Sequence, residues 1–568
     1  MDLDNSLGLI SLGTLGAGDK VIQGAENTSG TVNRSDYVLD ANGNSLFGEI
    51  VATSGHLTIQ DLTIQNASLI ATIDEGASAT FNNVTVLNSD FEMEEGEFPL
   101  KPESIVNNGG VVGFENTTFD MSVRSSGILT ATDSSFSMLE NVGGTANLTN
   151  TTLEGDDILG EALSIQAGTV NLDSSTVIDK AIVEVDGTLT ATNGTIFAGV
   201  ENAGTFTANG GSLAGLTNSG GTATLTSAQI NGPLEATAGT VDLDGTTVAD
   251  KTTVGISGTL SATNGTTFAA VENSGVFKIN GGSLESFINN VWAEEAEANL
   301  ISTRVNDFIS VYDGTTILDN STVLGYTLVG RAGKLTTQNN TILSAVGITE
   351  AVEMTSTNTI MKDVVNYGDF VSVNSTMDSL FTGGMGSATV QSSKITGELD
   401  VESYVELDAT TVGGKTTLTD SYATLLVKNN SKLSDVENTG VFTATDSTLE
   451  SLSNTDGTAT LSSAHVDNTI TATGGTVNLD DTVVISKTTV GTKAKLSATN
   501  GTSLAGVENA GAFIATDSTL ESLSNTDGTA TLTSTQVNGS LAITGGDVDL
   551  NGSIINGKTT VGTSGTLL

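Results

Sequence analysis

The chain repeats itself over a long, fixed period. Residues 450–461 and 521–532 carry the identical string ESLSNTDGTATL, 71 residues apart. The phrase Leu-Thr/Ser-Ala-Thr-Asn-Gly-Thr occurs at 189–195, 260–266 and 496–502, and its first two copies have the same spacing. Long internal repeats are typical of arrays in which each unit buries its apolar side only against its neighbours. The repeat therefore predicts a function spread over a surface more than held in a pocket.

The 71-residue super-repeat divides into shorter segments that read Gly-Thr-apolar-x-apolar. Their spacings run 17, 17, 18 and 19 residues, with starts at Gly187, Gly204, Gly221, Gly239 and Gly258. Near the C-terminus the series continues at 17, 18, 19 and 17, with starts at Gly440, Gly457, Gly475, Ala494 and Gly511. The unit is therefore a coil of 17–19 residues, and four unequal coils make one super-repeat.

Within a coil, apolar and polar residues alternate with a period of two. Residues 188–192 place Leu189 and Ala191 on one side and three threonines on the other. This alternation in β-branched residues indicates a half-buried strand. An Asn-Gly corner follows, because both residues tolerate the left-handed backbone, and then a second apolar run such as Leu213 with Leu216. Strand, corner, strand, corner predicts one coil of a parallel β-helix, bonded to its neighbours at about 4.8 Å.

The variable coil length and the absence of a six-residue period favour the right-handed form, and coils this short exclude propeller blades. We therefore predict an all-β, single-stranded right-handed parallel β-helix, a solenoid that forms a rod on the order of 140 Å long. An Asn precedes the opening Gly of many coils (Asn202, Asn218, Asn273, Asn438, Asn454, Asn509 and Asn525). These amides either stack into a ladder or each serve their own turn, and the sequence leaves both interpretations open.

Four regions follow along the chain. Residues 1–126 form an N-terminal cap and irregular coils, with an acidic insertion at 90–104; residues 127–285 form regular coils. Residues 286–430 form irregular coils with an insertion near Trp292, the only tryptophan, where Val291, Glu295, Ala298 and Ile301 have the spacing of a short helix. Residues 432–568 form regular coils again, and a new coil opens at 565–567, so we expect a fragment truncated at the C-terminus.

Charge and composition limit the possible partners. The 66 acidic residues outnumber the 19 basic ones, which gives a net charge of −47 and excludes nucleic acid and anionic membranes as partners. No stretch approaches the ~18 apolar residues that a membrane span requires, so no membrane insertion by this segment is expected. There is no cysteine, so stacking alone stabilises the chain.

Catalytic and metal-binding interpretations find little support. Asp242 with Asp244, and Asp480 with Asp481, are the nearest carboxylate pairs, and two carboxylates about 7 Å apart suit acid–base work. Equivalent positions recur at Asn171 and Asp173, at Asn478 and Asp480, and at Asp549 and Asn551, which is typical of solvated repeat positions. The four arginines (Arg34, Arg124, Arg304 and Arg331) are scattered, and His56 and His465 lack the partner spacing of a zinc site.

We therefore predict no catalytic, cofactor-binding or metal-binding residues, with weak divalent-cation binding as the most that stacked carboxylates provide. Outward Thr-x-Thr pairs such as Thr205 and Thr207 resemble the flat surface of β-helical ice-binding proteins, but Asp242 and Asp244 interrupt the row. Threonine on a solvent-facing strand is also what strand propensity alone favours.

The Gly-Thr-apolar-Thr-apolar coils with Asn-Gly corners, without Cys and poor in Pro, resemble the passenger region of adhesin-type autotransporters and related bacterial surface β-helix proteins. The resemblance covers residues 127–285 and 432–568 well and the rest loosely. It implies a right-handed β-helix displayed outside the cell and acting in adhesion or aggregation. The membrane barrel that the family carries at its C-terminus is missing from this sequence.

The expected function is an extracellular structural or adhesive rod, secreted from or displayed on a bacterial cell, that acts in adhesion, aggregation or spacing. Its expected partners are glycans or proteins on host or neighbouring cells, or further copies of itself. It is not expected to be an enzyme. The alternative is a carbohydrate-acting β-helix of the polysaccharide lyase or hydrolase type, with its site in the irregular middle, and a minor alternative is an ice-binding β-helix.

Overall fold

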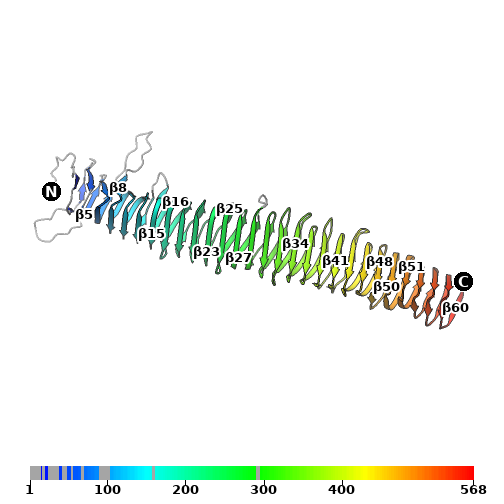
Figure 1. The fold of residues 1–568 in the computed structure, drawn as a ribbon. Coiled ribbons are helices and arrows are strands. Elements are labelled where there is room, and N and C mark those ends of the chain that lie inside the picture. Colours follow the sequence, from blue (N-terminus) through cyan, green and yellow to red (C-terminus); the bar gives the residue numbers. More distant parts are fainter. Residues whose placement is uncertain are drawn as a thin grey trace. The chain divides into compact units, whose positions relative to one another are not determined.

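The computed structural model describes residues 14–15, 20–23, 38–40, 48–52, 55–65, 69–87, 103–155, 160–289 and 295–568. The chain divides into two compact units, unit 1 (Met1–Leu284) and unit 2 (Glu285–Leu568). In each unit the described residues form strands and no helix, and successive strands stack in parallel (Figure 1). The predicted fold class, an all-β parallel solenoid with coils of about 18 residues, is confirmed.

Each regular coil of unit 1 contains three short strand positions. The coil after Gly204 has β18 (Thr205–Asn209), β19 (Ser212–Leu213) and β20 (Leu216–Asn218). These pair in parallel with β21 (Thr222–Thr226), β22 (Gln229–Ile230) and the start of β23 (Leu234–Asp244) in the next coil. We call the three resulting stacks the first, second and third faces of the solenoid.

The second apolar run of a coil is divided more finely than the sequence suggested. Leu213 and Leu216 belong to two strands, because Ala214 lies in a bend between them. In the preceding coil β17 (Ile196–Asn202) spans both positions, and its pairing with β16 (Thr176–Thr192) shifts register between them. A coil therefore has three faces and not two.

Unit 2 follows the same plan. One of its coils consists of β41 (Tyr404–Asp408), β42 (Thr411–Val412) and β43 (Thr416–Leu418). The next coil supplies β44 (Thr424–Lys428) on the first face and β45 (Lys432–Asn438) on the other two faces.

The helix considered near Trp292 is wrong for the part that the structure describes. Residues 297–305 form strand β28 (Glu297–Val305), in which Ala298 and Leu300 are buried two residues apart, a strand period and not a helical one. Trp292 itself and most of the acidic insertion at 90–104 lie outside the described residues.

The interior holds aliphatic side chains and stacked phenylalanines. The Phe197 and Phe206 rings are 5.7 Å apart and edge-to-face, and the Phe268 and Phe277 rings have the same separation. The second pair lies 71 residues after the first, so the super-repeat extends to the packing of the core. Edge-to-face pairs at this separation contribute beyond their buried area.

A column of buried hydroxyls lines one corner of the solenoid, although the period-two pattern placed the hydroxyls outside. At this corner one residue per coil has a left-handed backbone, such as Asn193 with φ 52° and Asn264 with φ 53°. A buried Ser or Thr comes two residues later, for example Thr195 and Thr266. The backbone N–H of Thr246 donates to Thr266 Oγ1 at 3.3 Å, so the hydroxyl satisfies a buried donor of the preceding coil.

The conserved spacing of asparagines produces buried amide pairs. The Nδ2 group of Asn202 donates to Asn218 Oδ1 at 2.6 Å, and the same bond joins Asn438 to Asn454 and Asn509 to Asn525. All six side chains are fully buried. The ladder is short, because the next two coils carry aliphatic residues at the same register position. Both interpretations hold, since Asn438 Oδ1 also accepts the N–H of Gly440 in its own turn.

One ion pair per super-repeat lies on the third face and was not anticipated from the sequence. Lys180 contacts Glu201 at 2.7 Å, and 71 residues later Lys251 contacts Glu272 at 2.8 Å. In unit 2 the equivalent pairs join Lys415 to Glu437 and Lys487 to Glu508. Each pair links neighbouring coils, and because it is partly exposed it contributes about 1 kcal/mol or less.

Candidate functional surface

The first face of unit 2 changes character at β41 and β44. Val405 and Leu407 of β41 are fully buried, which directs Tyr404, Glu406 and Asp408 outward. In the regular coils these positions carry mostly Thr and Ser, as in β21 and in β48 (Thr458–Ser462). An aromatic ring and two carboxylates here replace a row of small hydroxyls.

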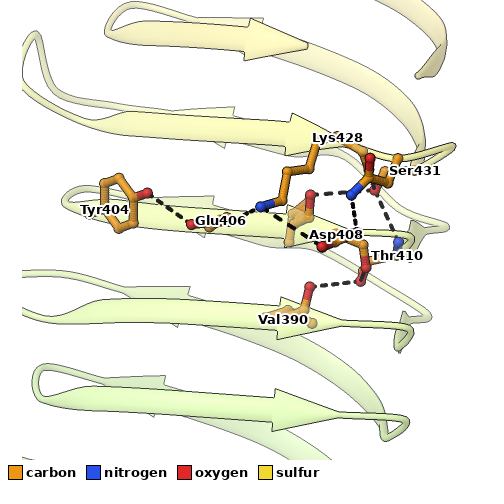
Figure 2. Close-up of polar contacts among 9 residues, drawn as sticks. Val390, Tyr404, Glu406, Asp408, Thr410, Lys428 and Ser431 are labelled. Atoms are coloured by element: carbon orange, nitrogen blue, oxygen red, sulfur yellow. Dashed lines mark hydrogen bonds and ion pairs between the residues drawn. The ribbon is translucent and has the colours of Figure 1, made fainter. Parts of the chain in front are cut away.

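Lys428 of the next coil joins these side chains. Its ammonium contacts Glu406 Oε1 and lies 3.8 Å from Asp408 Oδ2. The Tyr404 hydroxyl donates to the other oxygen of Glu406 at 3.2 Å, so phenol, carboxylate and ammonium form a line across two strands (Figure 2). Asn429 Nδ2 donates to Asp408 Oδ1 at 2.8 Å. We call Tyr404, Glu406, Asp408 and Lys428 the Tyr404 cluster.

The Tyr404 cluster rests on the buried hydroxyl column. Thr410 and Ser431 are fully buried, and the backbone N–H of Thr410 donates to Ser431 Oγ at 3.0 Å. Thr410 Oγ1 donates to the carbonyl of Val390 at 2.9 Å and to that of Asp408 at 3.0 Å (Figure 2). These bonds tie three successive coils together and fix the end of β41 on which Asp408 lies.

The cluster is held in fixed charge states around neutral pH. Its hydrogen bond to Glu406 raises the pKa of Lys428, and the charges of Glu406 and Asp408 act in the same direction, so Lys428 is a cation. Burial, and secondly the hydrogen bond to Glu406, raises the pKa of Tyr404, so its phenol stays protonated. A general base needs a pKa near the working pH. Neither Lys428 nor Tyr404 meets that condition, and the arrangement suits binding better than proton transfer.

The carboxylate pairs considered from the sequence are not brought together with other chemistry. Asp242 and Asp244 face outward on β23, where Asp242 is in register with Thr224 and Ser261. Asp242 therefore interrupts the threonine row of this face, as the spacing predicted.

Asp480 and Asp481 do not form a pair on one strand face. Asp480 accepts hydrogen bonds from Asn500 Nδ2 at 2.6 Å and from Thr499 Oγ1 at 3.3 Å. Asp481 occupies the left-handed corner position with φ 48°. Both residues serve the corner between two coils.

The histidines and described arginines have local partners. His56 is hydrogen-bonded to Ser78 at 2.7 Å through Nδ1, and His465 Nε2 lies 3.1 Å from Asp467. Arg124 contacts Glu140 at 3.5 Å, and Arg304 Nε donates to Asn306 Oδ1 at 2.8 Å. Arg34 lies outside the described residues. In the part of the chain that the structure describes, no three His, Asp or Glu residues gather closely enough to hold a metal ion.

The sequence analysis missed Tyr404, although the sequence holds a signal for it. Five of the six tyrosines fall between residues 312 and 422, inside the region that departs from the repeat. Interest in that region rested on Trp292 alone. Comparison with known proteins adds no name to this surface: no protein-family model, no curated protein and no solved structure matches the chain.

Proposed function

We propose that the protein is an extracellular structural and adhesive protein, in which regular coils serve as a spacer and the irregular coils of unit 2 carry the binding surface. The observation that carries this proposal is the replacement of small outward hydroxyls by the Tyr404 cluster. Tyrosine gives a large, rigid contact area with a polar end, and it is enriched at sites that contribute most to binding. Its partners are glycans or proteins on a neighbouring cell.

The acidic composition supports a role outside contact with nucleic acid, because a net charge of −47 repels phosphate backbones. Paired lysines at the Tyr404 cluster and on the third face leave few free cations to offset that charge. The described residues include no helix long and apolar enough to cross a membrane. Display on a bacterial surface follows from the resemblance of the coils to autotransporter passengers and is part of the proposal.

A carbohydrate-acting enzyme is the competing function, and the Tyr404 cluster is the place where it would act. Two carboxylates two residues apart on one strand, with a lysine beside them, have the residue types that such an enzyme needs. The cation of Lys428 engages both carboxylates, however, and its raised pKa keeps it protonated. We therefore propose binding without turnover.

The test restores the repeat at this surface. Replacing Tyr404 and Leu426, register neighbours of Thr424 and Glu406, gives a Y404T/L426T variant with outward threonines as in the regular coils. Beads coated with this variant should bind cells and glycan arrays at least several-fold less than wild type. The matched control is S497T/I514T, two outward positions in register on the same face of a regular block.

Equal adhesion by wild type and Y404T/L426T would remove the Tyr404 cluster from the proposal. Release of reducing sugars or unsaturated products from a polysaccharide, abolished by Glu406→Gln, would replace adhesion by the enzymatic function.

A further inference from the structure

A second surface in unit 2 gathers the side chains that recognise an organic cation. It lies at the corner that follows the third face, where the regular coils have small residues such as Ala203 and Gly204. Four successive coils there contribute Glu350, Tyr367, the Gly383–Gly384 pair and Glu402. We call Glu350, Tyr367, Phe381 and Glu402, with the two glycines, the aromatic corner.

Backbone hydrogen bonds place the four coils in order at this corner. Tyr367 follows β35 (Ile360–Asn366), and its N–H donates to the carbonyl of Ile348 in the preceding coil at 2.8 Å. The N–H of Gly383 donates to Asn366 O at 3.0 Å, and that of Glu402 donates to Thr382 O at 2.8 Å. The side chains of these corners are therefore neighbours along the solenoid, although 16–19 residues separate them in sequence.

Two aromatic rings form the apolar part of the corner. The Tyr367 and Phe381 ring centroids are 5.7 Å apart at an interplanar angle of 64°, an edge-to-face arrangement. Tyr367 is 39% exposed, so its ring is open to solvent on one side. An exposed aromatic face attracts an ammonium or guanidinium group through its quadrupole.

Carboxylates border the same two rings. A Cβ atom added to Gly384 would lie 3.3 Å from Tyr367 Cδ1 and 3.6 Å from Glu350 Oε1. A Cβ atom added to Gly383 would lie 2.7 Å from Phe381 Cζ and 3.0 Å from Glu402 Oε2. The glycine pair is thus a floor without side chains, on which each ring approaches one carboxylate.

These carboxylates lack the cation that their counterparts have. Glu201, Glu272, Glu406 and Glu437 are each paired with a lysine of a neighbouring coil. Among the described residues, neither Glu350 nor Glu402 has an ionic or hydrogen-bonding partner. A cation from another molecule would supply the missing charge and would also contact the ring of Tyr367.

We propose that the aromatic corner binds a lysine or arginine side chain of a partner protein. The occupant is cationic because both free polar groups are anionic, and it carries an aliphatic stem because the rings and the 84%-exposed Met385 offer apolar contact. This inference does not depend on the proposed adhesive function, since it requires only a basic segment within reach of unit 2.

The test measures the binding of a fluorescently labelled peptide, Gly-Ser-Lys-Gly-Ser-Arg-Gly-Ser, by anisotropy at low salt, with the full chain. A matched peptide carries Gln in place of Lys and Arg. Wild type should bind the basic peptide at least tenfold more tightly than its Gln counterpart. The isosteric variant E350Q/E402Q should lose at least fivefold in affinity, and Tyr367→Leu at least threefold. Salt should weaken the wild-type interaction.

Because the whole chain is strongly acidic, the control variant removes two charges elsewhere. D242N/D244N takes both carboxylates from an outward strand of unit 1 and should stay within twofold of wild type. An equal loss in D242N/D244N and E350Q/E402Q would overturn the proposal in favour of diffuse attraction. Binding of a neutral oligosaccharide that depends on Tyr367 but not on the two glutamates would overturn it in favour of a sugar site. A wild type without preference for the basic peptide would also overturn it.

Discussion

Replacing Asn525 by valine removes one half of a buried amide pair and tests how the coils are held in register. The Asn525 side chain accepts a hydrogen bond from Asn509 Nδ2 at 2.6 Å and donates to the carbonyls of Gly528 and Gly545, both at 2.8 Å. Valine fits the position, because the next coil carries Ile543 at the same register. The expected change therefore comes from lost hydrogen bonds more than from a changed volume.

The magnitude follows from those three bonds. Each contributes about 0.5–1.5 kcal/mol, and the amide of Asn509 is left buried with fewer partners. The local free energy of opening should fall by about 3 kcal/mol, which is about 100-fold in the opening equilibrium, since every ~1.4 kcal/mol is tenfold. The double variant N509V/N525V should cost less than the sum of the single variants, because no unpartnered amide remains.

Hydrogen exchange followed by mass spectrometry is the suitable assay, because a long repeat array does not unfold in two states. A fragment covering 512–532 reports on the altered coil. The fragment 441–461 holds the equivalent pair Asn438 and Asn454 and is an internal reference. A change below threefold at 512–532, or an equal change at 441–461, would refute the reasoning.

Three further predictions concern other features of the coils. Burial, followed by the charge of Glu398, raises the pKa of Asp400, so its ionised form destabilises the fold above pH ~4; Asp400→Asn should raise the thermal midpoint at pH 7 but not at pH 3, and no difference between the two pH values would contradict this. Gly221→Ala should destabilise its coil strongly, since a Cβ would lie 1.7 Å from a carbonyl oxygen of the preceding coil, whereas Gly199→Ala, with open space, should change the midpoint by about 1–2 °C; equal effects would disprove the steric argument. Lys251→Met should cost about 1 kcal/mol or less in urea unfolding, because its pair with Glu272 is half exposed, and a larger loss would show that the row of ion pairs holds the coils together.

The sequence anticipated the coil and the super-repeat but not the contacts between coils. Alternation at residues 188–192 identifies a strand and its inner side, because Leu189 and Ala191 occupy every second position. The positions of Asn202 and Asn218 before coil-opening segments suggested an amide ladder. Whether the amides bond to each other depends on the register of two coils, which the structure shows.

The functional surfaces were beyond the sequence for the same reason. Tyr404 and Lys428 belong to different coils and are 24 residues apart, and Tyr367 is 35 residues from Glu402. Coil lengths in the irregular region follow no fixed series, so the spacing could not tell which side chains share a corner. The right-handed sense of the solenoid, favoured by coil length, stays a prediction.

The amino-acid sequence by itself determined the strands, the period of about 18 residues and the parallel stacking, because alternating small apolar residues with left-handed corners leave a coil no other way to bury its apolar side. Only the tertiary structure decided which threonines turn inward to the buried column and which face water, since both occur in the same short motifs. It also decided which charges find partners. Those outcomes depend on atoms from neighbouring coils, and stacking alone brings them within bonding distance.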